Sequence, residues 1–213
     1  MSEPALVGVL AVQGDFREHR QALERCGARV AEVRRPEHLW GLDGLVIPGG
    51  ESSTIAKLLR AYALDEAIRR FAGEGGALWG TCAGAIAVAR EIEGHPDQPR
   101  LGLLDIAVAR NAYGRQVASF EVDLAVTGWQ SAFRALFIRA PRITCVGEGV
   151  SVLAVYDGRP VAVADANTLA TVFHPELTGD DRWHEAFVRR CLQARSRRAG
   201  PLPKAAPNEA RSS

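Results

Sequence analysis

The segment Gly80-Thr81-Cys82-Ala83-Gly84 limits most tightly what this chain can fold into. The apolar run Ala77-Leu78-Trp79 precedes it, and a second apolar run from Ala85 to Ala89 follows it. The pattern predicts a strand, a sharp turn and a helix start in quick succession, which is the layout of a nucleophile elbow with cysteine in place of serine. The glycines permit the turn because they carry no Cβ. A thiol at a helix N-terminus beside an imidazolium is favoured as the reactive thiolate.

The alternative interpretation of Cys82 is a buried structural cysteine, since free cysteine often behaves as a small core residue. A core cysteine does not need a strained turn, so the glycine spacing favours a nucleophile. The other three cysteines have no such setting. Cys26 and Cys191 are on apolar helical faces and Cys145 is in a strand-like run, so all three are predicted to be core residues.

Apolar runs alternate with helical patterns through the first half of the chain. Strands are predicted over residues 6–12, 30–33, 42–47 and 77–79, and helices over 15–26, 55–62, 65–72 and 83–92. Near-continuous apolar runs with β-branched residues suit parallel strands that are buried on both faces. This order predicts an α/β fold with a mostly parallel central sheet flanked by helices, as in flavodoxin-like proteins.

The second half is expected to add short strands to this fold. Strand-like runs cover residues 106–109, 119–126, 135–138, 143–146, 152–156 and 160–165. Asp157-Gly158 is a strong hairpin signal between the last two. A closing helix is predicted over 181–193. Residues 1–194 are therefore expected to form a single domain, and the proline-containing segment 195–213 is expected to be a disordered tail.

Composition excludes several classes of function. The formal net charge is +1, which gives no electrostatic argument for binding nucleic acid or a membrane surface. The chain has neither a long apolar stretch nor a basic leader, so no transmembrane helix and no signal peptide are expected. Four scattered cysteines without a CxxC pair indicate neither a zinc site nor a disulfide framework. We expect a cytoplasmic protein.

A histidine and a glutamate two residues apart form the second candidate cluster, in Phe173-His174-Pro175-Glu176. Proline biases His174 toward an extended conformation, in which residues two apart point to the same side. The imidazole of His174 is then able to face the thiol of Cys82 while the carboxylate of Glu176 fixes its tautomer. The alternative is a surface turn with an incidental histidine.

The third cluster is the loop Pro48-Gly49-Gly50-Glu51-Ser52-Ser53, at the carboxyl end of a predicted strand. An amide of this loop, at Gly50, and the amide of Ala83 are candidates to hold a tetrahedral oxyanion. The alternative is a plain strand-to-helix turn with a serine cap. The loop lacks the spacing and the lysine of a phosphate-binding loop. All three clusters follow strands, at the sheet edge where ligands bind in such folds.

Weaker signals remain open from the residues alone. Gln13, after the first strand, is predicted either to support the glycine loop, to contact a partner or to be a polar turn residue. Arg110-Asn111 and Ile138-Arg139 offer cations and donors for an amino-acid substrate, although surface arginines are the simpler interpretation. Four histidines are predicted to lack partners and to be structural or exposed: His19, His38, His95 and His184.

Together, these motifs resemble class I (triad) glutamine amidotransferases, and more narrowly the family of glutaminase subunits of pyridoxal 5'-phosphate synthase. GTCAG and FHPE are the general motifs. The narrower ones are GVLAVQGDFREH, IPGGESSTI, RNAYGRQVASFE, FIRAP and FHPELT. The match runs from about Val7 to Leu192, and the order and spacing of the motifs make it specific.

The resemblance implies glutamine hydrolysis with Cys82 as nucleophile and His174 and Glu176 as its partners. It implies glutamine binding by Gly49, Gly50, Glu51, Arg110, Ile138 and Arg139. It further implies that ammonia passes to a separate synthase subunit, and that this chain needs neither a metal nor pyridoxal phosphate itself.

Three rival classes are open at this stage. One is another cysteine hydrolase or a glyoxalase-like protein, which would place an acidic residue near the cysteine where Gln13 stands. Another is a non-catalytic binding subunit, which would not need an intact Cys, His and Glu set. The third is an amidotransferase of another pathway, which the narrow motifs disfavour.

Overall fold

The computed structural model describes residues 3–110 and 119–200. Their core is a seven-stranded sheet with strand order β10-β11-β12-β4-β3-β1-β2. Five of its strands run parallel: β1 (Leu6–Leu10), β2 (Arg29–Val33), β3 (Gly44–Ile47), β4 (Ala77–Thr81) and β12 (Thr168–Thr171). Nearly every residue of β1, β3 and β4 is buried. This burial explains why these strands are near-continuous apolar runs rather than alternating ones.

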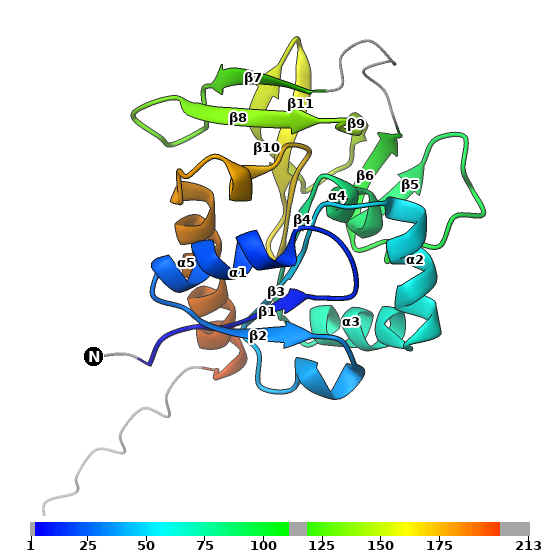
Figure 1. Ribbon diagram of the computed structural model, residues 1–213, viewed down its shortest axis with the longest axis vertical. Coiled ribbons are helices and arrows are strands. Elements are labelled where there is room, and N and C mark those ends of the chain that lie inside the picture. Colours follow the sequence, from blue (N-terminus) through cyan, green and yellow to red (C-terminus); the bar gives the residue numbers. More distant parts are fainter. Residues whose placement is uncertain (1–2, 111–118, 201–213) are drawn as a thin grey trace, which may run out of the picture.

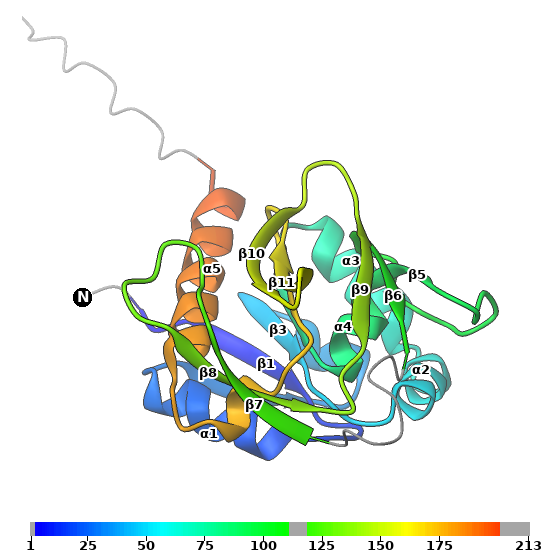
Figure 2. The same ribbon diagram turned by 90° about the horizontal axis from the view of Figure 1, so that it is seen from above.

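Helices cover both faces of the sheet (Figures 1 and 2). One face carries α1 (Phe16–Arg25) and α5 (Arg182–Arg198); the other carries α2 (Ser52–Ala61), α3 (Leu64–Gly73) and α4 (Ala83–Val88). In α5 the buried residues Trp183, Phe187, Cys191 and Ala194 recur every three or four positions, which is the stripe of a helix packed on a sheet. The predicted α/β class is thus confirmed. Among the described residues, no helix has the length and apolarity to cross a membrane.

The second half adds short strands, as predicted. The antiparallel hairpin of β10 (Ser151–Tyr156) and β11 (Arg159–Ala164) extends the main sheet, and two smaller sheets are formed by β5 (Ala89–Ile92), β6 (Leu104–Ala109) and β9 (Arg142–Val146), and by β7 (Ser119–Leu124) and β8 (Phe133–Ile138). Asp157 and Gly158 join β10 to β11 with φ of 49° and 69°, as a tight hairpin requires. Two short 3-10 helices complete the described elements: η1 (Pro36–Leu39) and η2 (Pro175–Leu177).

Four details differ from the sequence predictions. The helix predicted over 83–92 ends at Val88, and 89–92 form β5. All residues of α4 are buried, so its sequence shows no alternation of apolar and polar residues with a helical period. The end of the helix could therefore not be predicted from the pattern. The strand β12 was not predicted, because four residues of Thr-Leu-Ala-Thr give a weak signal. Cys145, expected in the core, is exposed on β9.

The fourth difference concerns the C-terminal segment. The helix α5 continues to Arg198, beyond the predicted end of the domain at 194. Ala194 is fully buried, and Arg195 forms hydrogen bonds to Asp43 Oδ1 at 2.8 Å and to the carbonyl oxygen of Pro4 at 2.8 Å. These contacts hold the last turn, so disorder beginning at residue 195 is wrong. Residues 201–213 of the predicted tail lie outside the described part.

Candidate active site

Cys82 is at the turn between β4 and α4, in a backbone conformation that side chains rarely adopt. Its φ of 47° and ψ of −104° fit neither helix nor strand. Glycine is needed on both sides of it: a Cβ on Gly84 would run into the backbone carbonyl of Ile47, and a Cβ on Gly80 would meet the backbone of Gly84. The strained turn holds the sulfur at the carboxyl edge of the sheet, as a nucleophile elbow does.

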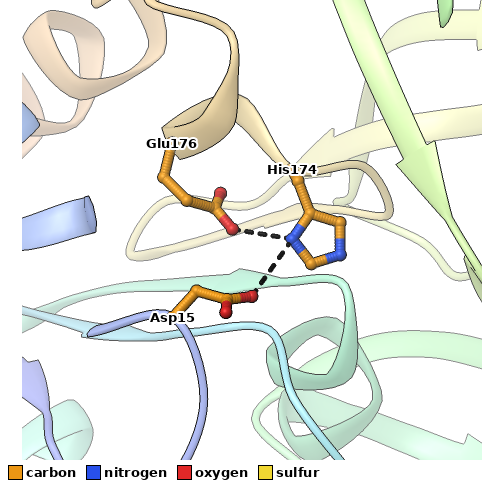
Figure 3. A group of neighbouring side chains, drawn as sticks. All are labelled: Asp15, His174 and Glu176. Atoms are coloured by element: carbon orange, nitrogen blue, oxygen red, sulfur yellow. Dashed lines mark hydrogen bonds and ion pairs between the residues drawn. The ribbon is translucent and has the colours of Figure 1, made fainter. Parts of the chain in front are cut away.

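The imidazole of His174 reaches Cys82 because β12 pairs in parallel with β4. The chain leaves β12 at Thr171, and the backbone N–H of His174 then donates to the carbonyl oxygen of Leu136 at 2.8 Å. The side chain lines the same pocket as Cys82. Its Nδ1 is 2.7 Å from Glu176 Oε1 (Figure 3). The backbone route differs from the expected one, because Glu176 is in the 3-10 helix η2 rather than in an extended segment.

The surroundings of His174 favour its protonated form. Burial alone lowers its pKa, but hydrogen bonds and charges from Cys82 and Glu176 outweigh burial and raise the pKa to about 10. A raised pKa means that the proton is held through neutral pH. The stabilisation that it gives to the fold is complete below the ordinary value of 6.5 and is lost as the pH rises through about 10.

The Cys82→Ala variant tests this coupling directly. Burial lowers the pKa of His174, and Cys82 is one of the groups that raise it. Without the sulfur, the pKa of His174 is therefore expected to fall. The measurement is an NMR titration of ¹⁵N-labelled imidazoles in both proteins, with the exposed His95 as an internal control. An unchanged midpoint for His174 would show that the thiol and the ring are not coupled.

A pocket of about 590 Å³ opens beside the sulfur. It brings together most of the residues predicted to be functional, from segments far apart in the sequence. Its lining consists of Asp15, Gly50, Glu51, Ser52, Cys82, Ala83, Ile86, Arg110, Ile138, Arg139, Pro141, His174 and Leu177. Only 7% of Cys82 is exposed, and its Sγ lies 3.8 Å from the carbonyl oxygen of Ile138. The thiol is therefore sheltered, with access through this pocket.

Three predicted residues contact the site without lining the pocket. Glu176 is buried behind His174, and Gly49 lies against the ring of His174. Gln13 Oε1 accepts a hydrogen bond of 2.9 Å from the backbone N–H of Glu51, and its amide fills the space that a Cβ on Gly50 would need. Gln13 thus holds the glycine loop. Asn111, the remaining candidate, lies outside the described residues.

Replacing Gly49 with alanine is expected to lower kcat by about 100-fold, because a displacement near 1 Å can cost that much. A Cβ on Gly49 would lie 2.5 Å from His174 Cε1, so the ring must move. Steady-state kinetics measure the effect, with Gly73→Ala as the matched control because a Cβ there meets nothing within 4 Å. Normal kcat in Gly49→Ala would show that the ring position is not critical.

Glu51 caps the N-terminus of α2 and gives the pocket a fixed negative charge. Its carboxylate accepts hydrogen bonds from the hydroxyls and backbone N–H groups of Ser53 and Thr54, at 2.6 to 3.1 Å. These bonds, led by the hydroxyl of Ser53, lower the pKa of Glu51 to about 2. Arg110 Nη2 lies 3.7 Å from Glu51 Oε1, so the pocket presents both signs of charge. An amino acid with a free ammonium and carboxylate group matches that pattern.

Sequence reasoning missed three side chains in and behind the site: Asp15, His19 and His184. Asp15 Oδ2 lies 3.5 Å from His174 Nδ1, and burial raises the pKa of Asp15 while the His174 charge opposes that rise. His19 and His184, predicted to lack partners, bond to each other in the core. The spacing of Asp15 and His19 was the signal that could have found them. Asp15 follows the first strand, at the sheet edge of the site, and His19 is four residues later on the same side of α1.

Nδ1 of His174 and the carboxylates of Asp15 and Glu176 also meet the distance requirement for a cation site. Their ligand atoms lie within 4.8 Å of one another, and the three side chains converge in Figure 3. A cation bound to Nδ1 would break the hydrogen bond between Nδ1 and Glu176. The ring of His174 would then lose the contact that orients it. The donor set therefore fits an orienting role better than a resident metal.

A strained thiol, an imidazole and a carboxylate in this order, above a parallel sheet, are characteristic of cysteine hydrolases with a catalytic triad. Comparison with known proteins narrows the class. The chain belongs to the SNO glutamine amidotransferase family, whose sequence profile matches residues 9–193.

Individual relatives agree with this assignment. The "Pyridoxal 5'-phosphate synthase subunit PdxT" of Thermus thermophilus is 58% identical over 184 residues, covering 86% of this chain and 96% of the relative. The protein of the same name from Deinococcus radiodurans is 55% identical, covering 85% and 95%. A solved glutamine amidotransferase structure is 55% identical and has a TM-score of 0.84, covering 87% of this chain and 98% of its own. The predicted resemblance is thus confirmed.

Proposed function

We propose that this protein hydrolyses L-glutamine to L-glutamate and ammonia, and that it supplies the ammonia to a synthase subunit that makes pyridoxal 5'-phosphate. One pocket brings together the thiol of Cys82 and the ring of His174, which is hydrogen-bonded to Glu176, and presents both signs of charge; this arrangement is the observation that carries the proposal. The family supports the choice of glutamine, and the names of the relatives support the synthase partner.

In the first half of the reaction, the Cys82 thiolate attacks the side-chain amide carbon of glutamine. The backbone amides of Gly50 and Ala83 stabilise the negative oxygen of the tetrahedral intermediate. His174 then gives its proton to the nitrogen, the carbon–nitrogen bond breaks, and ammonia leaves. The γ-glutamyl group is now a thioester on the sulfur.

In the second half, neutral His174 takes a proton from water, and the hydroxide attacks the thioester carbonyl. The carbon–sulfur bond breaks, glutamate leaves, and the thiolate and imidazolium are restored. Glu176 accepts from Nδ1–H throughout, which keeps Nε2 directed at the reaction and stabilises the imidazolium. We assign recognition of the amino-acid end to Gly49, Gly50, Glu51, Arg110, Ile138 and Arg139.

The partner assignment is tested by whether ammonia from glutamine reaches the product of the synthase subunit. With [amide-¹⁵N]glutamine, the full chain mixed with the synthase subunit of its own organism should yield ¹⁵N-labelled pyridoxal 5'-phosphate. Excess unlabelled ammonium in solution should dilute the label little if the ammonia passes directly. Release of glutamate without label in the product would limit the protein to a free-standing glutaminase.

The four free cysteines fit a reducing compartment, and we place the protein in the cytoplasm.

A further inference from the structure

A histidine outside the pocket lies directly behind the triad. His19, on α1, is fully buried, and its Nε2 is 3.3 Å from Glu176 Oε2. Figure 3 shows why this oxygen matters: Oε1 of Glu176 meets the ring of His174, while Oε2 is turned away from it. Within the described part of the chain, Oε2 is buried and has no well-aligned hydrogen bond. A buried carboxylate oxygen without a donor is costly, so the nearby ring nitrogen is significant.

Charge determines which ring nitrogen of His19 carries the proton. Burial, followed by the charges of His184 and His174, lowers the pKa of His19, so its ring is neutral and only one nitrogen is protonated. The protonated His174 lies 2.7 Å from Glu176, and its charge favours the carboxylate form of Glu176 against burial. A bare nitrogen facing Oε2 would repel it. The proton therefore belongs on Nε2, where it is shared between Glu176 Oε2 and the hydroxyl oxygen of Thr81 at 3.1 Å.

The next residue behind His19 is consistent with this tautomer. His19 Nδ1 lies 3.0 Å from His184 Nε2, so Nδ1 accepts and His184 donates. His184 Nδ1 then carries only a lone pair, and it is the atom of that ring without a partner among the described residues. The opposite order would leave a buried N–H unpaired, which is rarer in proteins than an unpaired acceptor. The contacts at Glu176 and at His184 therefore indicate the same direction of donation, from His184 to His19 and from His19 to Glu176.

We propose that His19 is a positioning residue for glutamine hydrolysis, whose Nε2–H donates to Glu176 Oε2 and so holds the carboxylate against His174. This inference rests on the proposed function. His19 does not line the pocket and acts through Glu176 alone. Because hydrogen bonds to a carboxylate favour its charged form, His19 also keeps Glu176 ionised despite burial, which raises the pKa of Glu176.

The charged and titratable neighbours of Glu176 come from four segments. His174 precedes η2, Asp15 precedes α1, His19 is on α1, and His184 reaches the group through His19 from α5. Asp15 contacts His174 from the exposed side, so it cannot replace a donor to Oε2. Removing the N–H of His19 should therefore let Glu176 protonate at a higher pH than in the parent protein.

The tautomer is measured first, in the unaltered full chain, and needs no variant. Two-dimensional ¹⁵N–¹H NMR of the histidine rings distinguishes a proton on Nε2 from one on Nδ1. We expect a neutral His19 with the proton on Nε2, unchanged across neutral pH. A proton on Nδ1 would overturn the proposal, whatever the kinetics show.

Kinetics of the complex with the synthase subunit then test the role. We expect His19→Phe to lower kcat about 10-fold to 100-fold, with KM changed less than twofold. The acid limb of its pH profile should move to higher pH. His19→Gln restores an amide N–H at a similar reach and should recover most of kcat and the original acid limb. His95→Phe is the matched control, because His95 is exposed and is not part of the pocket lining.

Each outcome separates this inference from the proposed function. If Cys82→Ala is inactive while folded His19→Phe has the parent kcat and acid limb, the positioning role is wrong and the function stands. Equal losses in the Phe and Gln variants would also reject the role, since packing alone would explain them. If the parent protein does not hydrolyse glutamine at all, the proposed function fails, and the tautomer measurement still decides the hydrogen bond. If His19→Phe does not fold, the NMR measurement of the His19 tautomer and the kinetics of His19→Gln decide whether His19 has the positioning role.

Discussion

Replacing Cys82 with alanine should reduce glutamine hydrolysis at least about 10⁴-fold, because the variant has no nucleophile and only binding and oxyanion contacts remain. The reaction would have to proceed by direct attack of water. The fold should persist, since the change removes one sulfur from the edge of a pocket rather than from the core. Glutamate release is measured in the presence of the synthase subunit.

Cys145→Ala is the matched control for this variant. Cys145 is exposed on β9 and is not part of the pocket lining, so its removal should leave kcat within twofold. Similar rates for the parent protein and Cys82→Ala would reject the nucleophile. A loss in Cys145→Ala as large as in Cys82→Ala would leave the assignment of the reactive thiol without support.

Replacing His174 with alanine is expected to cost about 10³-fold to 10⁴-fold in kcat, with a smaller change in KM. The ring supplies the proton to the departing ammonia and then activates water, so both halves of the reaction are slowed. Loss of the imidazolium also removes the charge that favours the Cys82 thiolate. The rate of Cys82 alkylation by iodoacetamide should therefore fall in parallel with kcat.

His38→Ala serves as the control for His174→Ala, since His38 is exposed on η1. If His174→Ala retained parent kcat and parent alkylation rates, the ring would have no part in the chemistry. A loss of kcat with unchanged alkylation would restrict His174 to the proton-transfer steps. That result would contradict the coupling inferred between the ring and the sulfur.

The sequence predicted the elements whose signals are local. The elbow at Cys82 was visible because the turn needs Gly80 and Gly84, which stand in the sequence beside two apolar runs. The α/β class followed from alternating strands and helices, and the family match confirms the amidotransferase assignment. His174 and Glu176 were expected to point together, and they do, although through a 3-10 helix that the two-residue spacing alone did not indicate.

The remaining features depend on long-range packing. The strand β12 is held by pairing with β4 and β11 rather than by the propensity of its four residues. His19 and Glu176 are 157 positions apart, and only the packing of α1 against η2 brings them together. Asp15 reaches His174 for the same reason. A single sequence contains no signal that links such residues, so their partners had to come from the folded chain.

Trapping the covalent intermediate tests the account most directly. The complex with the synthase subunit is mixed with glutamine, quenched in acid within the first turnover, digested, and analysed by mass spectrometry. The account predicts one added glutamyl group on the peptide that contains Cys82, lost on treatment with hydroxylamine and missing from Cys82→Ser. A glutamyl group on another residue, or glutamate formed at full rate by Cys82→Ser, would contradict it.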